Sequence, residues 1–370
     1  MADYNVVILY LLIATALSGL LVIFIYHATK KRRNIWELII GLAFGVVGGF
    51  SAFFYTLLEA SGIKVPILLS VELVCYGILI LLFFLFLNNI ISHTNVYRFL
   101  VPFALFTTMT ITHVQILQFS PEFPLESHVT KTLWLYADIG YEFLSITTFL
   151  VMSLYAYLKS YIYAKDRKTL LLIMASIVIG IGYICLFTWD LLSYSGITDE
   201  ILDLLSSAGD LIVFMGLLII LITYASDIDF IYKFPFDSYI LMVYYNYGVM
   251  IYSTEFVSKK SKSIEEDLVG GLISSLNTIF VNVLELERDI MQQVSGKKAH
   301  ILAASGKYIT AAIISERMSV YLLRALRRFV KEFEDEFRKE LEANENDRSK
   351  FIRANALVMN VFPYISLKPK

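Results

Sequence analysis

The sequence predicts a bundle of seven membrane-spanning helices followed by a soluble α+β domain. Of its 370 residues, 57% are hydrophobic and only 17% are charged, whereas soluble proteins have roughly half apolar and about a quarter charged residues. Seven long apolar segments precede Asp227, and the chain from there to Lys370 has the composition of a soluble protein. We therefore expect a transmembrane domain at residues 1–228, a juxtamembrane linker at 229–237 and a cytoplasmic domain at 238–370.

Each apolar segment is long enough to be a transmembrane helix, since about 20 mostly apolar residues cross about 30 Å of hydrocarbon. The expected spans are residues 6–28, 35–58, 65–91, 99–119, 132–157, 170–192 and 201–224. The first has no basic residue before it, so it is expected to be a retained helix and not a signal peptide. The fourth is diluted by threonines and by His113.

Basic residues in the connecting segments predict the orientation, because Lys and Arg near span ends are retained in the cytoplasm. One side has only Lys64 and Lys131. The other has Lys30, Lys31, Arg32, Arg33, Arg98, Lys159, Lys165, Arg167 and Lys168. The chain is thus expected to be a multi-pass protein of the cell membrane with an extracellular N-terminus and a cytoplasmic C-terminal domain.

Small residues within the spans predict close helix packing. Gly41, Gly45 and Gly49 recur every four residues, which lets a neighbouring backbone approach. Packing within the bundle is the expected use, and homodimerisation is the alternative. Cys75 and Cys185 both lie in apolar segments, so they predict neither a disulfide nor a thiolate metal site.

Acidic residues within the spans fall in the predicted outer halves of the helices, apart from Glu37 at the cytoplasmic boundary. Asp138 and Glu142 are four residues apart and Asp203 and Asp210 are seven apart, so each pair shares a helix face. No Lys or Arg lies in these outer halves, although a lone charge in hydrocarbon is costly. We therefore expect an acidic cavity that opens outward, in which these side chains meet water or a cationic ligand.

The candidate ligand-binding residues of this cavity combine acids with aromatic side chains. The shallower acids Glu59, Asp190 and Asp203 are expected to be solvated. The deeper candidates are Glu72, His113, Asp138, Glu142 and Asp210, with Trp134 and Tyr141 at similar depth. Carboxylates beside aromatic rings suit an organic cation such as an amine, and carboxylates with His113 would suit a hard divalent metal. Trp134 and Trp189 have the alternative role of an interfacial aromatic belt.

The cytoplasmic halves of the spans contain almost no ionisable residue, which favours sensing over transport. A transporter needs polar groups along a path through the bilayer. A retinal protein needs a lysine for its Schiff base, and the seventh span has none. The chain shows no catalytic or cofactor-binding motif, so we expect neither an enzyme nor a bound cofactor.

The soluble part predicts five strands and two or three helices. Runs at 239–245 and 249–253 form a hairpin around Asn246-Tyr247-Gly248. A helix at 263–283 follows, then strands at 289–294, 299–303 and 308–315. A long helix comes next and a final helix is expected at 349–361. The apolar face of the long helix consists of Leu322, Leu326, Phe329, Phe333 and Phe337.

This order resembles the longin and roadblock family of small regulatory domains, in which helices pack on a five-stranded antiparallel sheet. The resemblance covers roughly residues 236–362 and depends on element order and on stretches such as DSYILMVYYNYGVMIYSTEF and GKYITAAIISER. The chain is also similar to modules attached to seven-helix membrane proteins in some archaea. The family implies a docking platform for a small GTPase or for another longin or roadblock-type chain.

We therefore expect a seven-helix receptor that binds a cation or metal ion in the outer cavity and signals through the cytoplasmic domain. Its expected partners are the lipid bilayer and a small GTPase or a related domain, with a homodimer as an option and no nucleic acid. One alternative is a transporter or channel with a regulatory cytoplasmic domain. The other is a membrane anchor for a GTPase-binding platform.

Overall fold

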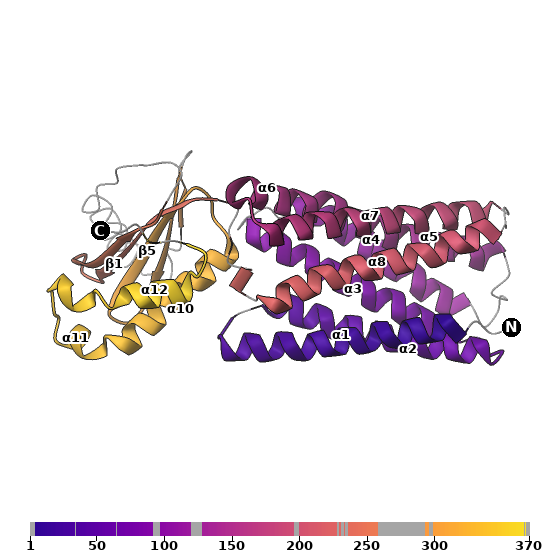
Figure 1. Cartoon of the computed structure of the whole chain (residues 1–370), viewed down its shortest axis with the longest axis horizontal. Coiled ribbons are helices and arrows are strands. Elements are labelled where there is room, and N and C mark those ends of the chain that lie inside the picture. The colour runs from indigo at the N-terminus through magenta and orange to yellow at the C-terminus, as the bar shows by residue number, and fades with distance from the viewer. Residues whose placement is uncertain are drawn as a thin grey trace. The chain divides into compact units, whose positions relative to one another are not determined.

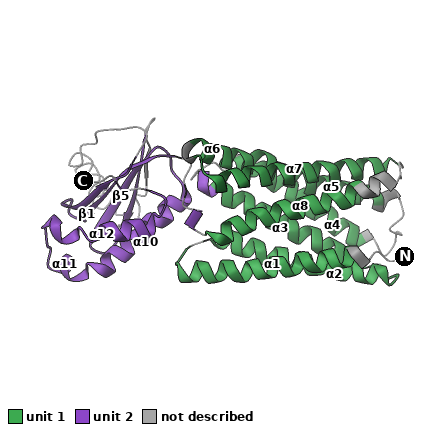
Figure 2. Ribbon diagram, in the orientation of Figure 1, with its two compact units in different colours: residues 1–88, 94–228 green, residues 89–93, 229–370 purple. Residues whose placement is uncertain are grey.

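The computed structural model of the chain consists of two compact units (Figure 2). One comprises residues 1–88 and 94–228, and the other comprises residues 89–93 and 229–370. The structure describes residues 4–33, 35–63, 65–91, 97–119, 128–195, 200–227, 229–230, 233, 236–257, 293–295, 299–365 and 367. For the short strand at 293–295 and for some residues at the ends of helices, only the backbone is described.

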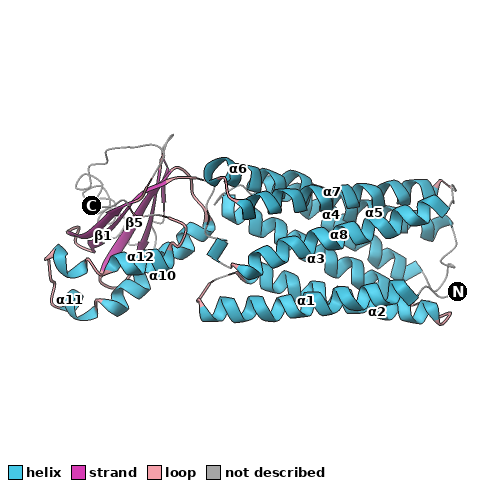
Figure 3. Ribbon diagram, viewed as in Figure 1, coloured by secondary structure: helices cyan, strands magenta, loops and turns pink. Residues whose placement is uncertain are grey.

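The first unit is helical throughout its described elements (Figures 1 and 3). Seven of its helical segments are long and apolar enough to cross a membrane, which confirms the multi-pass prediction. The fifth span is continuous from α5 through the π-helix η1 into α6. The elements are α1 (Tyr4–Lys30), α2 (Trp36–Ala60), α3 (Pro66–Ile91), α4 (Tyr97–Phe119), α5 (His128–Ile146), η1 (Thr147–Ser153), α6 (Leu154–Ala164), α7 (Arg167–Tyr194) and α8 (Glu200–Ser226).

Short turns make consecutive helices antiparallel neighbours. After α2 the chain reverses at Ser61 and Gly62, and Gly62 adopts the positive φ of 83° that glycine tolerates. Between α6 and α7, Lys165 is left-handed and the Asp166 side chain accepts the amide hydrogen of Thr169, which caps α7. One end of the bundle thus carries the start of α1 and the α2–α3 turn, and we call it the acidic end. The opposite end, with the α1–α2 and α6–α7 turns, is the basic end.

Glycines allow helices of the bundle to pack closely. A Cβ on Gly49 would lie 3.1 Å from the backbone of Ala14 in α1, and one on Gly182 in α7 would lie 3.0 Å from the carbonyl oxygen of Gly209 in α8. Gly41 and Gly45 face Leu79 of α3. The predicted use of the glycine stripe in packing within the bundle is therefore confirmed.

The second unit contains an antiparallel sheet with strand order β2-β1-β5-β4-β3. Four strands have six to eight residues, and β3 is a three-residue segment paired with β4. The strands are β1 (Ser238–Tyr245), β2 (Met250–Glu255), β3 (Gln293–Ser295), β4 (His300–Ser305) and β5 (Ile309–Ser315). The predicted helix at 263–283 and most of the predicted strand at 289–294 lie outside the described residues.

Helices α10 (Val320–Glu336), α11 (Arg338–Glu342) and α12 (Ala354–Val361) follow the sheet. Helix α10 packs against β4, β5 and α12. The apolar face predicted for the long helix is fully buried, which confirms the prediction made from residue spacing. It consists of four residues of α10 and the residue that follows the helix: Leu322, Leu326, Phe329, Phe333 and Phe337. The final helix starts later than predicted, because Asp347 accepts the amide hydrogen of Ser349 and holds a separate 3-10 turn, η3 (Arg348–Phe351).

Candidate functional site

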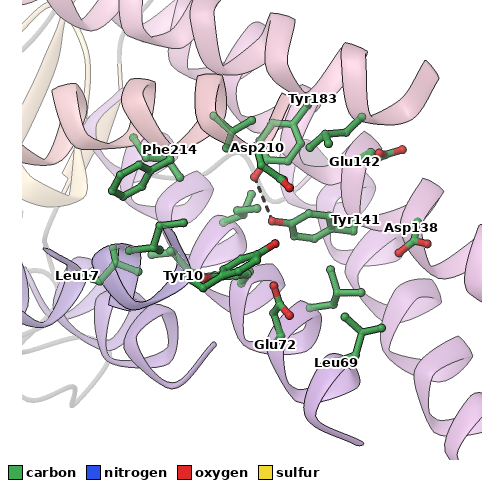
Figure 4. A pocket seen from close by; sticks show the side chains of 18 of the residues that line it. Tyr10, Leu17, Leu69, Glu72, Asp138, Tyr141, Glu142, Tyr183, Asp210 and Phe214 are labelled. Atoms are coloured by element: carbon green, nitrogen blue, oxygen red, sulfur yellow. Dashed lines mark hydrogen bonds between the residues drawn. The ribbon is translucent and has the colours of Figure 1, made fainter. Parts of the chain in front are cut away.

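The bundle contains a partly open cavity of about 640 Å³ that is lined by side chains from α1, α2, α3, α5, η1, α7 and α8 (Figure 4). Pockets for small ligands typically measure about 300–1,000 Å³. All the residues of its lining belong to the first unit. The seven-helix arrangement therefore provides space for a ligand inside the membrane-spanning part.

Six carboxyl groups line this cavity, and they come from five helices. Among its described lining residues there is no Lys, Arg or His. The acids are Glu59 of α2, Glu72 of α3, Asp138 and Glu142 of α5, Asp190 of α7 and Asp210 of α8. Helices α2 and α7 end at the acidic end, whereas α3, α5 and α8 begin there. The six acids, near the ends of the first two helices and in the first halves of the other three, therefore lie near the acidic end. The cavity thus carries a strong negative potential at that end if its acids are ionised.

Two of the acids are deeply buried. The side chain of Glu142 is 3% exposed and that of Glu72 is 8% exposed. Glu142 Oε2 has no hydrogen-bond partner among the described residues, although Glu142 and Asp190 hydrogen-bond to each other. Two carboxyl groups in such contact need a proton or a cation between them, because like charges repel. The site is therefore arranged to take up positive charge.

Aromatic residues complete the acidic half of the cavity. The hydroxyl groups of Tyr141 and Tyr183 lie 3.1 Å apart and hydrogen-bond across α5 and α7, as the dashed line in Figure 4 marks. Trp134 and Trp189 also line the cavity. Tyr10 of α1 lies opposite Tyr141 in Figure 4. Aromatic rings and carboxylates are the two kinds of group that contact an organic ammonium ion.

Sequence reasoning missed three lining tyrosines, Tyr10, Tyr55 and Tyr76. Tyr76 follows Glu72 by four residues, so a shared helix face could have revealed it. Tyr10 precedes Ile13 and Leu17 at spacings of three and seven, and all three line the cavity. Nothing in that run distinguishes a cavity tyrosine from an interfacial one. Asp190, expected to be solvated, contacts Glu142.

His113 does not join the cavity lining. It is 1% exposed, and its ring packs edge-on against Trp134 with 5.3 Å between ring centroids. Both of its ring nitrogens lack hydrogen-bond partners within the described part of the chain. His113 therefore lies behind Trp134, whereas the sequence suggested that it faces the ligand. The side chain of Asp203 is outside the described residues.

The acids also do not gather into a metal-binding cluster. Within the described ranges, no three side chains of Asp, Glu, His or Cys come close enough together to hold one metal ion. Hard divalent cations bind through several convergent oxygen ligands. The distributed carboxyl groups fit an organic cation of larger radius better than a bare metal ion.

A row of hydroxyl contacts runs from the cavity toward the basic end. Beyond the Tyr141–Tyr183 pair, Ser153 and Ser176 hydrogen-bond at 2.7 Å. Further along, the Tyr157 hydroxyl lies 3.1 Å from that of Tyr224, in the last turn of α8. These contacts join the fifth span to α7 and then to α8.

The fold and the cavity together define a multi-pass membrane protein with a ligand-sized acidic cavity. Comparison with protein-family models, with curated proteins and with solved structures finds no match to this chain. The resemblance of its second unit to longin and roadblock domains stays a prediction. The geometry of the site is therefore the basis for inferring what the protein does.

Proposed function

We propose that this protein is a seven-helix receptor that binds a cationic ligand in the acidic cavity and signals through its soluble unit. The single observation behind the proposal is the set of six lining carboxyl groups with no basic residue in the described lining. A cation is the ligand that such a set favours, because it replaces mutual repulsion by attraction in a medium of low dielectric constant.

The arrangement favours sensing over transport because the carboxyl groups are confined to one half of the cavity. The lining toward the basic end consists of side chains such as Leu38, Leu42 and Leu221. Transported ions require polar groups along the whole path and usually a site near the bilayer midplane. A ligand bound at the acidic end of this cavity would meet an apolar barrier before the other side.

The hydroxyl contacts supply a candidate route from the cavity to α8. A bound cation beside Tyr141 would change the contacts that Tyr141 makes with Tyr183, and the same pair of spans meets again at Ser153 and Ser176. A ligand shifts such a bundle only if it binds one of two states more tightly. In this proposal the favoured state differs at Tyr157 and Tyr224, close to the end of α8.

The soluble unit is proposed to be a longin-like or roadblock-like platform. Its antiparallel sheet and the helix α10 that packs on it support this assignment, and the basic residues at one end of the bundle favour a cytoplasmic location. Such a platform would dock a small GTPase or a second longin or roadblock-type chain. Helix α8 leads into its first strand within eleven residues, from Ser226 to Ser238.

Thermal unfolding of the detergent-purified protein tests the proposal. Organic amines should raise the unfolding temperature of the wild type, by linkage worth about 2.7 kcal/mol at a hundredfold excess over Kd. The double variant Glu142→Gln and Asp210→Asn should lose this response, because it removes two lining charges. Glu37→Gln, in the first turn of α2 at the basic end, is the matched control.

The proposal fails if neither amines nor divalent metal ions stabilise the wild type, or if the double variant responds like the wild type. Uptake or current in reconstituted liposomes would instead establish a transporter or channel. In either case the Glu37→Gln control separates a cavity effect from a general effect of surface charge.

A further inference from the structure

The cavity changes in character along its length. On α8 its lining begins with Ser206 and Asp210 and continues through Phe214 to Leu221. On α3 it passes from Glu72 to Phe83 in the same direction. Figure 4 shows Leu17 and Phe214 on one side of Tyr10 and the acids on the other. The acidic end therefore continues into a purely apolar half.

The cavity is also long. At 1.5 Å per residue, its lining extends about 22 Å along α8 from Ser206 to Leu221, and about 25 Å along α3 from Pro66 to Phe83. That length suits an extended hydrocarbon chain. A compact amine would fill only the acidic end.

Buried polar atoms mark where the head group would lie. Glu142 Oε2 is buried without a partner in the described structure, and Glu72, elsewhere in the lining, is 8% exposed. An unpartnered buried oxygen costs about 1–3 kcal/mol. A cationic donor would satisfy it, because an ammonium group donates hydrogen bonds and carries the charge that ionised carboxyl groups attract.

We infer that the ligand is an amphiphile with an ammonium head group and a hydrocarbon chain, that is, a long-chain amine. This inference rests on the proposed function and specifies its ligand. The ammonium group lies among Glu72, Glu142 and Asp210, and the chain extends past Leu17 and Phe214. The head group supplies much of the affinity, because the chain leaves one hydrocarbon medium for another. A short amine leaves the apolar half unfilled and loses its packing contacts, so the apolar half favours a long chain.

The tryptophans provide a direct probe of this site. The chain has three, and Trp36→Phe leaves Trp134 and Trp189, both in the cavity lining. The full-length Trp36→Phe protein in phosphatidylcholine nanodiscs is titrated with hexadecylamine, ethylamine and hexadecanol while tryptophan fluorescence is recorded. Variants are compared at equal mole fraction in identical bilayers, which cancels the partitioning of the chain into lipid.

Hexadecylamine should give a saturable change in fluorescence, and hexadecanol should not. Its affinity should fall at least about tenfold in Glu142→Gln with Asp210→Asn, and should stay unchanged in Glu37→Gln. Leu17→Phe, which narrows the apolar half, should weaken hexadecylamine by about tenfold and leave the weaker ethylamine binding unchanged. Leu217→Phe narrows it from α8 and is the second variant if Leu17→Phe does not fold.

The outcomes distinguish this inference from the proposed function. If ethylamine binds as tightly as hexadecylamine, or if both narrowing variants bind hexadecylamine normally, the long-chain inference is overturned and the cationic site remains. Equal binding of hexadecanol and hexadecylamine also overturns it. If no amine of either length alters the fluorescence, the inference is overturned, and the proposed function fails as well when divalent metal ions leave the unfolding temperature of the wild type unchanged.

Discussion

Glu142 combines deep burial with an unsatisfied carboxyl oxygen. A leucine at this position would avoid the cost of that oxygen, about 1–3 kcal/mol. Violations of local stability rules concentrate at functional sites, where the cost is offset elsewhere. Among the six lining acids, Glu142 is therefore the one that most clearly needs a hydrogen-bond partner from a ligand, because the described part of the protein supplies none for its Oε2.

Tyr252 of β2 gives a prediction for the soluble unit. Its hydroxyl donates to Asn355 Oδ1 at 2.6 Å, and burial away from water raises its pKa to about 12. In the unfolded chain a tyrosine ionises near pH 10. Above that pH the unfolded state holds fewer protons than the folded state. The contribution of Tyr252 to the free energy of unfolding is therefore fully present below about pH 10 and is lost as the pH rises toward about 12.

Tyr252→Phe should lower the free energy of unfolding by about 1 kcal/mol at neutral pH, because the hydrogen bond to Asn355 is lost. Between about pH 10 and 12 its stability should decline less than that of the wild type. Thermal unfolding followed by circular dichroism measures both effects. Tyr247→Phe, at an exposed tyrosine, is the control, and parallel pH curves for wild type and Tyr252→Phe would refute the assignment.

At the scale of elements, the contact between α7 and α8 depends on glycine. A Cβ on Gly182 would lie 2.7 Å from Val213 Cγ2 and 3.0 Å from the Gly209 carbonyl oxygen, and backbone cannot give way as a flexible side chain does. Gly182→Ala should therefore destabilise the bundle by about 1–3 kcal/mol. The unfolding temperature in detergent measures this, and Gly19→Ala, with nothing within 4 Å of its Cβ, should have no such effect. Equal melting of the two variants would contradict the close contact.

Elements with strong periodicity could be predicted from the sequence, and elements set by local exceptions could not. Seven apolar runs and the buried face of α10 follow directly from residue spacing. The π-helix η1 did not, because Thr147 and Thr148 beside apolar residues read as ordinary helix. The boundary of α12 was also missed, since the Asp347 cap competes with helix extension.

The candidate site was predictable in part for the same reason. Ionisable residues in apolar runs have few alternatives, so Glu72, Asp138, Glu142 and Asp210 could be assigned to a cavity that they do line. His113 could not be placed, because the direction of a single residue on α4 depends on how that helix rotates against α5. The apolar half of the cavity leaves no trace in the sequence, since its leucines resemble those that face lipid.

At the scale of the whole molecule, orientation in the membrane is the prediction with the widest consequences. In a background with Cys75→Ala and Cys185→Ala, we expect Ser61→Cys at the acidic end to react with an impermeant maleimide in intact cells. Lys30→Cys at the basic end should react only after permeabilisation, because basic span ends are retained inside. Both positions are exposed. The opposite labelling pattern would place the acidic end inside and remove the extracellular ligand from the proposal.

The π-helix η1 divides the fifth span into two parts, one with Asp138 and Glu142 and one with Tyr157. A π-turn contains one residue more than an α-helical turn. If this wide turn migrated along the span, each residue that it passed would rotate by about 100° while both ends of the helix stayed in place. Such a shift would change which residues near the carboxyl groups face the cavity. The helix would neither lengthen nor move through the bilayer.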